Sequence, residues 1–183
     1  MSKPSPVPPA IPDLAQLHLT HAFFLDCVIR HTMPAPAMLI PADELHDLNL
    51  DFGLELRFDA TEKYVELDPA FRLSFRNPAG EPVPLEGYFR LRFRFTVDNL
   101  PDLLVAVPEP PGLVPSADLI LALASMSYST ARGMVIGKTA GTPFERLALP
   151  VIDAREFLAR ALAPAQPAPR KRAGVRRARP ASE

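Results

Sequence analysis

Cysteine is nearly absent from this chain of 183 residues, because Cys27 is the only one. A single cysteine excludes an intramolecular disulfide, and nothing in the composition suggests an oxidising compartment. The beginning of the chain lacks the features of a signal peptide, since no apolar segment follows Lys3. No apolar run approaches the length of a membrane span. We therefore expect a soluble, cytoplasmic protein without membrane insertion.

Catalytic and metal-binding motifs are lacking as well. Residues 133–139 resemble a phosphate-binding P-loop, but three residues separate the glycines instead of four, and the segment closes a helix. His18 and His21 are expected on opposite faces of a strand, which prevents a shared metal ion. Cys27 alternates into an apolar set, and Ser127 lacks the glycine-flanked turn of a serine nucleophile. We predict no enzyme, no cofactor and no metal site.

Charge and proline are unevenly distributed along the chain. The formal net charge is −1, yet residues 164–183 carry six Lys/Arg against one acidic residue, Glu183, a net charge of +5. The other residues hold 14 Lys/Arg and 20 Asp/Glu, a net charge of −6. Because proline breaks helices and cannot donate to a β ladder, proline clusters mark segments outside the fold. We expect a disordered segment at 1–14, one domain at 15–163 and a disordered basic tail at 164–183.

The basic tail suggests two roles. Its charge alone could attract nucleic acid or an anionic surface. It has no aromatic residues on which bases could stack and no recognition fold around it. A solubilising or docking tail is therefore favoured, and nucleic acid is not expected as a partner.

Three stretches alternate apolar and polar residues with almost no error, at 48–59, 63–76 and 87–98. Successive side chains of a strand point to opposite faces, so this period predicts strands with one packed and one solvated face. A weaker alternation at 17–29 predicts a fourth strand. Short connections favour an antiparallel sheet that needs a covering element.

Two features qualify this pattern. In the stretch at 17–29, Phe23 falls on the packed side, whereas Phe24 and Val28 fall on the other side. Pro69 interrupts the hydrogen-bonding potential of the strand at 63–76, which suggests an edge position or a bulge.

After a proline-rich loop at 108–115, the apolar period changes to that of a helix running from about 118 to 138. Ser116 or Asp118 can cap it. Apolar residues surround much of its circumference, which predicts burial on more than one face, against the sheet and against another subunit. A short helix at 154–162 follows, and the order β-β-β-β-α-α predicts an α+β fold.

The polar sides of the strands carry carboxylates that alternate with arginines, among them Glu66 and Asp68 opposite Arg90, Arg92 and Arg94. We expect a solvated face with cross-strand ion pairs, each contributing a few tenths of a kcal/mol.

The order of elements and two local strings resemble the SecB-type export chaperones. The first string is YSTARGMVIGKTAGTP (Tyr128–Pro143), which contains the Ala131–Arg132 pair and a Gly-Thr-Pro break. The second is LALPVIDAREFL (Leu147–Leu158), an extended Leu-x-Leu-Pro-Val stretch that leads into the last helix. The resemblance covers about residues 15–163.

The resemblance implies a SecB-like α+β fold, with a four-stranded antiparallel sheet followed by a long helix and a short C-terminal helix. It also implies a cytoplasmic, ATP-independent holdase that keeps unfolded polypeptides or preproteins competent for SecA-dependent export. Members of the family form a dimer of dimers, with the long helices between the dimers. The interface residues expected from this homotetramer are Ile120, Leu123, Met126, Tyr128 and Met134.

The same resemblance places an apolar peptide groove between the loop after the first strand, the last helix and the stretch before it. Methionine suits such a surface because it is flexible and polarisable. The expected peptide-binding residues are Met33, Met38, Leu39, Ile40, Phe144, Leu147, Leu149, Val151, Ile152 and Phe157. For each of them, closure of the core is the alternative.

The chain departs from its apparent relatives in charge. Family members are strongly acidic and dock SecA through acidic groups on the exposed sheet face, whereas this face carries Arg90, Arg92 and Arg94, and the tail is basic. A SecB-fold adaptor or chaperone dedicated to one partner, such as an antitoxin, is therefore the alternative hypothesis.

Overall fold

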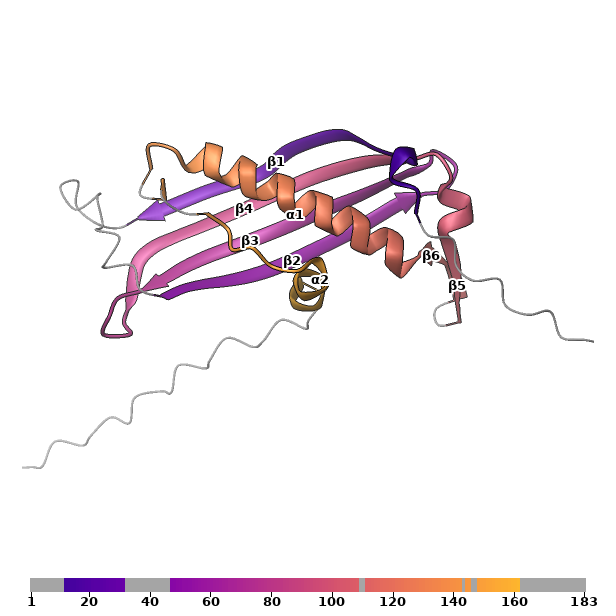
Figure 1. Cartoon of the computed structure of the whole chain (residues 1–183). Helices are drawn as coiled ribbons and strands as arrows, with labels where there is room; N and C mark the ends of the chain where they lie inside the picture. Colours follow the sequence, from indigo (N-terminus) through magenta and orange to yellow (C-terminus); the bar gives the residue numbers. More distant parts are fainter. Residues whose placement is uncertain (1–11, 32–46, 109–110, 143, 146–147, 162–183) are drawn as a thin grey trace, which may run out of the picture.

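The computed structural model describes residues 12–31, 47–108, 111–142, 144–145 and 148–161. In this part of the chain, a four-stranded antiparallel sheet is covered on one face by a long helix, with a short helix beside it (Figure 1). The expected α+β class and order of elements are confirmed. The two added hairpin strands and two 3₁₀ turns lie at one end of the sheet.

The main sheet has the spatial order β1-β4-β3-β2. Its strands are β1 (Leu17–His31), β2 (Asp47–Asp59), β3 (Tyr64–Arg76) and β4 (Pro82–Val97). Alternation in the sequence appears directly in β3 and β4, where buried apolar residues alternate with partly exposed polar ones. Strand β4 begins five residues before the expected start at 87, because its pairing with β3 continues to Pro82 opposite Arg76. Strands β1 and β2 are the two edges.

Pro69 lies in the interior of the sheet, and the prediction of an edge position or a bulge is wrong. Strand β3 has a neighbour on each side, and Pro69 lies opposite Leu54 of β2. Toward β4 the register runs from Leu67 opposite Phe93 to Ala70 opposite Arg90 without a shift. The buried proline ring contributes to the apolar face, so the strand tolerates one absent N–H donor.

Strand β1 contains two irregularities, and the first of them reverses the expected placement of its aromatic residues. The register to β4 shifts between Leu19 and His21 and again between Phe24 and Asp26. Each extra residue moves the following side chains to the other face. Phe24 therefore packs on the covered face, and Phe23 lies on the open face, where it is 43% exposed.

Helix α1 (Ala117–Thr139) lies across the sheet (Figure 1). Its N-cap is Ser116, whose Oγ accepts a hydrogen bond from the backbone N–H of Leu119 at 3.3 Å. Helix α2 (Ala154–Ala161) follows a short extended segment, and Asp153 Oδ1 accepts from the N–H of Arg155 at 2.7 Å. Both N-termini are thus satisfied by the capping side chains that the sequence offers.

Helix α1 is long and apolar enough to cross a membrane by length and composition, with a hydropathy of 1.4 over its best window. The expectation that no segment reaches this threshold is therefore corrected. Eight of its 23 residues are buried, and this packing accounts for part of the apolar composition of the helix. They are Leu119, Leu123, Ala124, Ser127, Tyr128, Ala131, Val135 and Thr139.

A hairpin replaces the expected loop at 108–115. Between β4 and α1 lie the 3₁₀ turn η3 (Leu100–Leu103) and strands β5 (Leu104–Pro108) and β6 (Pro111–Pro115), which pair with each other. The other 3₁₀ turn, η1 (Leu14–Gln16), precedes β1. The prolines occupy the first and last pairs of the hairpin, where a missing donor costs least.

The core lies between the sheet and α1. Its largest fully buried side chains come from β3 and β4 and include Phe71, Phe89, Phe93 and Phe95. Gly87 marks a close approach, because a Cβ at this position would lie 3.2 Å from side-chain atoms of both Leu73 and Phe144. The segment after α1 is thereby packed onto the end of the sheet.

Candidate functional site

An open groove lies on the outer side of α1, between the first described residues and the beginning of α2. Its volume is about 920 Å³. Most of its lining is apolar or small, from three separate segments of the chain: Pro12, Leu14, Leu121, Ala122, Ile152 and Ala154. We call this feature the α1–α2 groove. A broad apolar groove is suited to an extended polypeptide more than to a small polar ligand.

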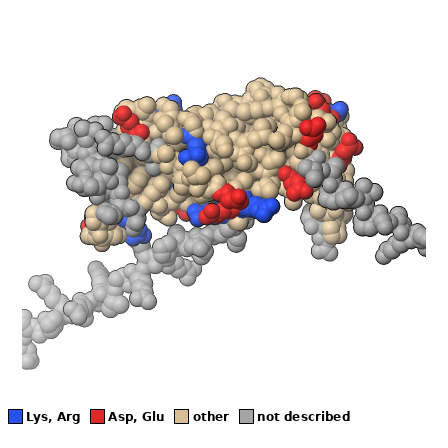
Figure 2. Space-filling model, viewed as in Figure 1, with Lys and Arg blue, Asp and Glu red and all other residues tan. Residues whose placement is uncertain are grey.

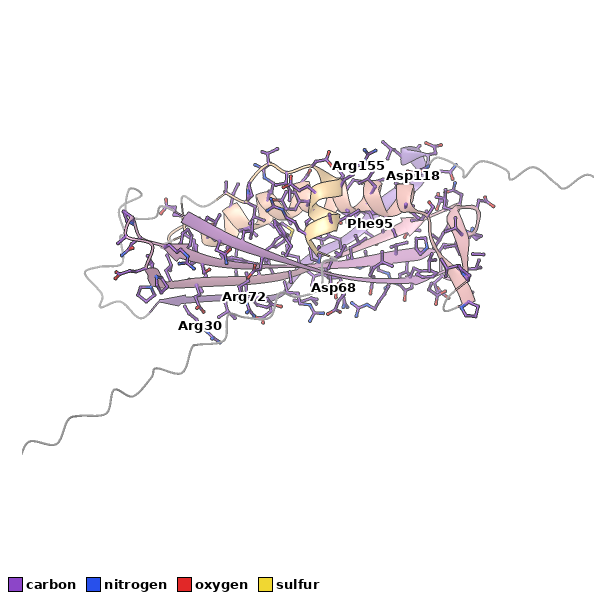
Figure 3. The ribbon with its side chains drawn as sticks, turned by 90° about the horizontal axis from the view of Figure 1, so that it is seen from below. Arg30, Asp68, Arg72, Phe95, Asp118 and Arg155 are labelled. Atoms are coloured by element: carbon purple, nitrogen blue, oxygen red, sulfur yellow. The ribbon has the colours of Figure 1, made fainter. Side chains whose placement is uncertain are left out.

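The rim of the α1–α2 groove is charged. Among the described lining residues, Asp118 and Asp153 carry negative charge and Arg155 carries positive charge. Asp118 and Arg155 lie on the helix side of the sheet, opposite the face that carries Arg30 and Arg72 (Figure 3). Acidic side chains also gather at the end of the molecule where α1 begins (Figure 2). This rim favours a ligand with basic groups at that end.

The segment between α1 and α2 is fastened to α1 by two hydrogen bonds. Tyr128 Oη donates to the carbonyl of Pro150 at 2.7 Å, and Arg132 Nε donates to the carbonyl of Leu149 at 2.8 Å. Leu149 is fully buried, whereas the next apolar residue, Val151, is 82% exposed. The wall of the groove is therefore held in place while an apolar side chain faces solvent.

Tyr128 and Arg132 were not expected as supports of the site. Their spacing of four places both side chains on one face of a helix, which is the signal that could have found them. Burial raises the pKa of Tyr128 to about 12, and the nearby charges of Arg132 and Arg160 oppose this rise. The phenol is therefore protonated at neutral pH and remains a hydrogen-bond donor to Pro150.

An aromatic cluster supports α2 against the sheet. The ring centroids of Tyr128 and Phe157 are 5.1 Å apart, and Phe157 also contacts Phe52 of β2 and Phe71 of β3. Aromatic pairs at these separations add to the stability gained by burial alone. They fix the beginning of α2 at the groove.

The expected peptide-binding residues divide into three groups. Phe144, Leu149 and Phe157 are at most 1% exposed and belong to the core, so the alternative of core closure describes them in this chain. Val151 is exposed, and Ile152 lies in the groove. The others lie outside the described residues: Met33, Met38, Leu39, Ile40 and Leu147.

The expected interface residues of the long helix also differ in accessibility. Leu123 and Tyr128 are buried within the subunit. Ile120, Met126 and Met134 are partly buried. The exposed side of α1 is instead formed mainly by small residues, with one large apolar side chain, at Ser125, Ser129, Gly133, Ile136 and Gly137. A subunit that packs on α1 would meet these residues first.

The open face of the sheet is more than a solvated surface with weak pairs. Asp68 is 1% exposed and is enclosed by arginines from β2 and β4. Arg92 donates two hydrogen bonds to its carboxylate, at 2.9 and 2.8 Å, and Arg57 donates a third. Burial acts to raise the pKa of Asp68, but these partners outweigh burial and lower it.

Two of the remaining arginines of this face are also paired with carboxylates. Arg90 lies 2.8 Å from Glu55, and Arg94 lies 3.8 Å from Glu66. The positive charges of Arg90, Arg92 and Arg94 on β4 are therefore balanced by carboxylates of the neighbouring strands, so these arginines do not form a free basic surface.

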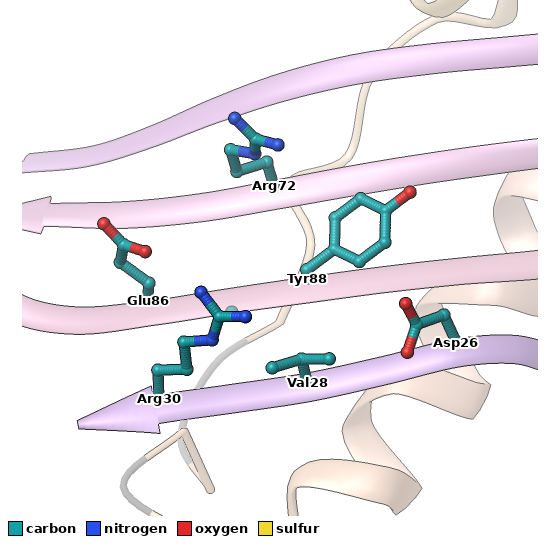
Figure 4. A pocket seen from close by; sticks show the side chains of 7 residues that line it. Asp26, Val28, Arg30, Arg72, Glu86 and Tyr88 are labelled. Carbon is teal, nitrogen blue, oxygen red and sulfur yellow. The ribbon is translucent and has the colours of Figure 1, made fainter.

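A smaller hollow of about 340 Å³ lies on the open face (Figure 4). Arg30 of β1 and Arg72 of β3 lie on opposite sides of it, with Glu86 and Tyr88 of β4 between them, and Asp26 lies farther along β1 from Arg30 (Figure 4). Among the described residues that line this hollow, charges of both signs are equal in number, and Val28 is the one large aliphatic side chain. It is unsuited to an apolar polypeptide segment.

His18 and His21 lie on the same face of β1, which corrects the expectation of opposite faces. The shift of register between Leu19 and His21 places them opposite Thr96 and Arg94. His18 Nε2 lies 3.3 Å from Asp98 Oδ2. Within the described residues, no group of three His, Cys, Asp or Glu side chains is placed to hold a metal ion.

No protein-family model matches the chain. No curated protein matches it either. Among solved structures, the chain is similar to the Mycobacterium tuberculosis Rv1957 SecB-like chaperone in complex with a ChAD peptide from the Rv1956 HigA1 antitoxin, with 19% sequence identity and a TM-score of 0.47. The match covers 76% of this chain and 92% of that chain.

Proposed function

We propose that this protein is an ATP-independent holdase that binds non-native polypeptide and performs no catalysis. The observation that carries the proposal is the α1–α2 groove, where Leu121, Ile152 and the adjacent Val151 present apolar surface on a fixed wall. A holdase must accept many unrelated segments, so it needs apolar surface that its own fold leaves accessible.

The residues that carry the SecB-type resemblance support the same proposal. Ala131 packs in the core, and its neighbour Arg132 holds the carbonyl of Leu149. The Ala-Arg pair and the extended stretch that begins at Leu147 are therefore physically linked, because Arg132 holds the stretch against α1 through the carbonyl of Leu149. Val151, two residues after Leu149, is left free to contact a client.

The finer parts of the proposal concern assembly and delivery. We place the protein in the cytoplasm as a homotetramer that holds preproteins for SecA-dependent export. An edge strand supports assembly, because among the described residues β1 pairs with β4 alone and carries exposed apolar residues at Leu19, Phe23 and Leu25. Exposed edges of this kind invite pairing with another chain.

The direct test is suppression of aggregation of a reduced, unfolded client without nucleotide. Wild-type protein should keep the client soluble. Val151→Asp should reduce this activity at least about fivefold, because a charge in the binding surface must lose its hydration when an apolar segment binds. Light scattering of the client measures the effect.

Val105→Asp is the matched control, because Val105 is 38% exposed on the hairpin and is not among the described residues that line the groove. It should suppress aggregation as well as wild type does. If Val151→Asp is as active as wild type, the proposed site is wrong. If the client aggregates in the presence of wild-type protein, the proposed function is wrong.

A chaperone or adaptor dedicated to one partner is the second candidate. The balanced charges around Asp68 favour it, because an acidic face for docking SecA is absent from the described strands. Co-purification with SecA distinguishes the two candidates, together with competition between two unrelated unfolded clients for the groove. A general export holdase should bind SecA and both clients.

A further inference from the structure

We propose that residues 162–183 of this chain dock in the α1–α2 groove and compete there with client polypeptide. The tail is thus an intramolecular occupant of the site. The competition rests on the proposed function, whereas the docking of the tail does not depend on it.

The order of residue types along the tail matches the groove. Residues 162–169 read LAPAQPAP and carry no charge, and the six basic residues follow at 170–179. The groove has an apolar middle at Leu121, Ala122 and Ile152 and an acidic end at Asp118. Proline-rich segments lose little entropy when they bind apolar grooves, because their extended conformation is already favoured.

The length of the tail is also sufficient. Helix α2 leads away from the groove, since Ala154 lines it and Ala161 is the last residue of the helix. Eight helical residues advance the chain by about 12 Å. Eight residues in polyproline conformation span about 25 Å, so residues 162–169 can return past the start of α2. Arg170 would then reach the beginning of α1.

Charge complements this geometry at the beginning of α1. Asp118 lines the groove, and Asp13 lies between two lining residues. Asp102 belongs to η3, which lies beside the beginning of α1. The backbone N–H of Ser116, the N-cap of α1, donates a hydrogen bond to the carbonyl of Leu103, the last residue of η3, at 2.8 Å. These three aspartates are exposed, whereas Arg155 is the one cation that lines the described groove. Exposed pairs are screened by salt, so docking should weaken as ionic strength rises.

The experiment uses the full chain with the six Lys/Arg of the tail changed to Gln, which leaves the groove without its basic occupant. A fluorescein-labelled synthetic peptide of residues 162–183 is added, and its anisotropy is measured at about 50 and 300 mM salt. The peptide should bind, and more weakly at high salt. Asp118→Asn should weaken binding about threefold, as expected for one exposed pair. Ala122→Arg should abolish binding by filling the groove with a cation.

Asp51→Asn is the control, because Asp51 is an exposed carboxylate on the opposite face of the sheet. It should leave peptide binding unchanged. No binding of the peptide, or equal binding by the Ala122→Arg and Asp51→Asn proteins, would refute the docking. Deletion of residues 1–11 is a further test. If this deletion, and none of the substitutions, abolishes peptide binding, the peptide binds the N-terminal segment and the proposed docking in the groove is refuted.

The competition is measured separately with an unfolded client. The chain with the neutral tail should bind client at least about threefold more tightly than wild type at low salt, a difference that high salt removes. If the labelled tail binds the groove but no client binds either protein, the proposed function fails and the docking stands. If client binds both proteins equally, the function stands and the competition fails.

Discussion

Asp68 lies on the open face of the sheet, yet water barely reaches its carboxylate, because the residue is 1% exposed. Three arginines cover it, and two of them donate hydrogen bonds to it. A buried charge of this kind is tolerated only when its partners satisfy it. Asp68 therefore connects β2, β3 and β4 on the face that no helix covers.

Asp68→Asn should lower the free energy of unfolding by about 1–3 kcal/mol at pH 7, since charge-assisted hydrogen bonds are lost and the arginines remain crowded. Urea denaturation of the variant and of Asp51→Asn measures the difference. Asp51 is exposed, so its substitution should change stability by less than about 0.5 kcal/mol. Equal stability of Asp68→Asn and wild type would contradict this account.

The same carboxylate predicts a pH dependence. Its pKa is lowered in the folded protein, so the unfolded chain takes up a proton first as the pH falls. The stabilisation by Asp68 is complete above the unfolded pKa of about 3.9 and is lost below it, as the pH falls through the folded pKa. The stability difference between wild type and Asp68→Asn should therefore shrink below about pH 4. If the stability difference between wild type and Asp68→Asn stays constant from pH 7 to pH 3, the lowered pKa of Asp68 does not contribute to stability.

Tyr128 has a comparable role on the covered side. Tyr128→Phe should retain the aromatic packing on Phe157 but lose the hydrogen bond to Pro150, which costs about 1 kcal/mol. Client binding should also weaken, because the wall that presents Val151 becomes less fixed. Tyr88→Phe on the open face is the control, with denaturation and client binding as the two measurements. Unchanged client binding in Tyr128→Phe would remove the link between the wall and the site.

At the scale of the element, β1 differs most from its sequence pattern. A strict alternation from 17 to 29 would bury Phe23, yet the first of two register shifts packs Phe24 against the core instead. The edge strand carries exposed apolar side chains at Leu19, Phe23 and Leu25, and the shifts account for Phe23 on the open face and for Leu25 as the extra residue between Phe24 and Asp26. Exposed apolar edges are normally avoided unless another chain covers them.

Leu25→Lys should therefore reduce the mass of the assembly in solution from that of the proposed tetramer to that of a smaller species. Lysine on an edge strand opposes pairing with a second chain. Light scattering coupled to gel filtration measures the mass. Leu113→Lys on the hairpin, where Leu113 is 57% exposed, is the control and should keep the wild-type mass. A wild-type protein that is already monomeric would exclude assembly through β1.

At the scale of the whole molecule, charge is divided between faces and segments. The open face balances arginines with carboxylates, the end where α1 begins is acidic, and the tail carries +5. The net charge of −1 conceals this arrangement. The contrast between the acidic end and the basic tail is the basis for the proposed docking.

Much of the fold could be predicted because it depends on local periodicity. Period two in 48–59, 63–76 and 87–98 fixes which side chains share a face, and the change of period after Ser116 identifies α1. The hairpin β5–β6 was missed because its prolines indicate a loop, although they occupy only the ends of the pairing. The site was predicted less well, since Phe144 and Phe157 have the same apolar character whether they bind a client or close the core.

The sequence by itself determined the α+β class, the order of the main elements and the separation of a basic tail from an acidic body, because these follow from residues close together in the chain. Only the tertiary structure decided that Asp68 is enclosed by Arg57 and Arg92, that Leu149 is buried and that Val151 is exposed. Burial depends on which distant segments pack together, and the alternation of residues within one segment contains no information about these contacts. The groove exists for the same reason, since residues from Pro12 to Arg155 form it together.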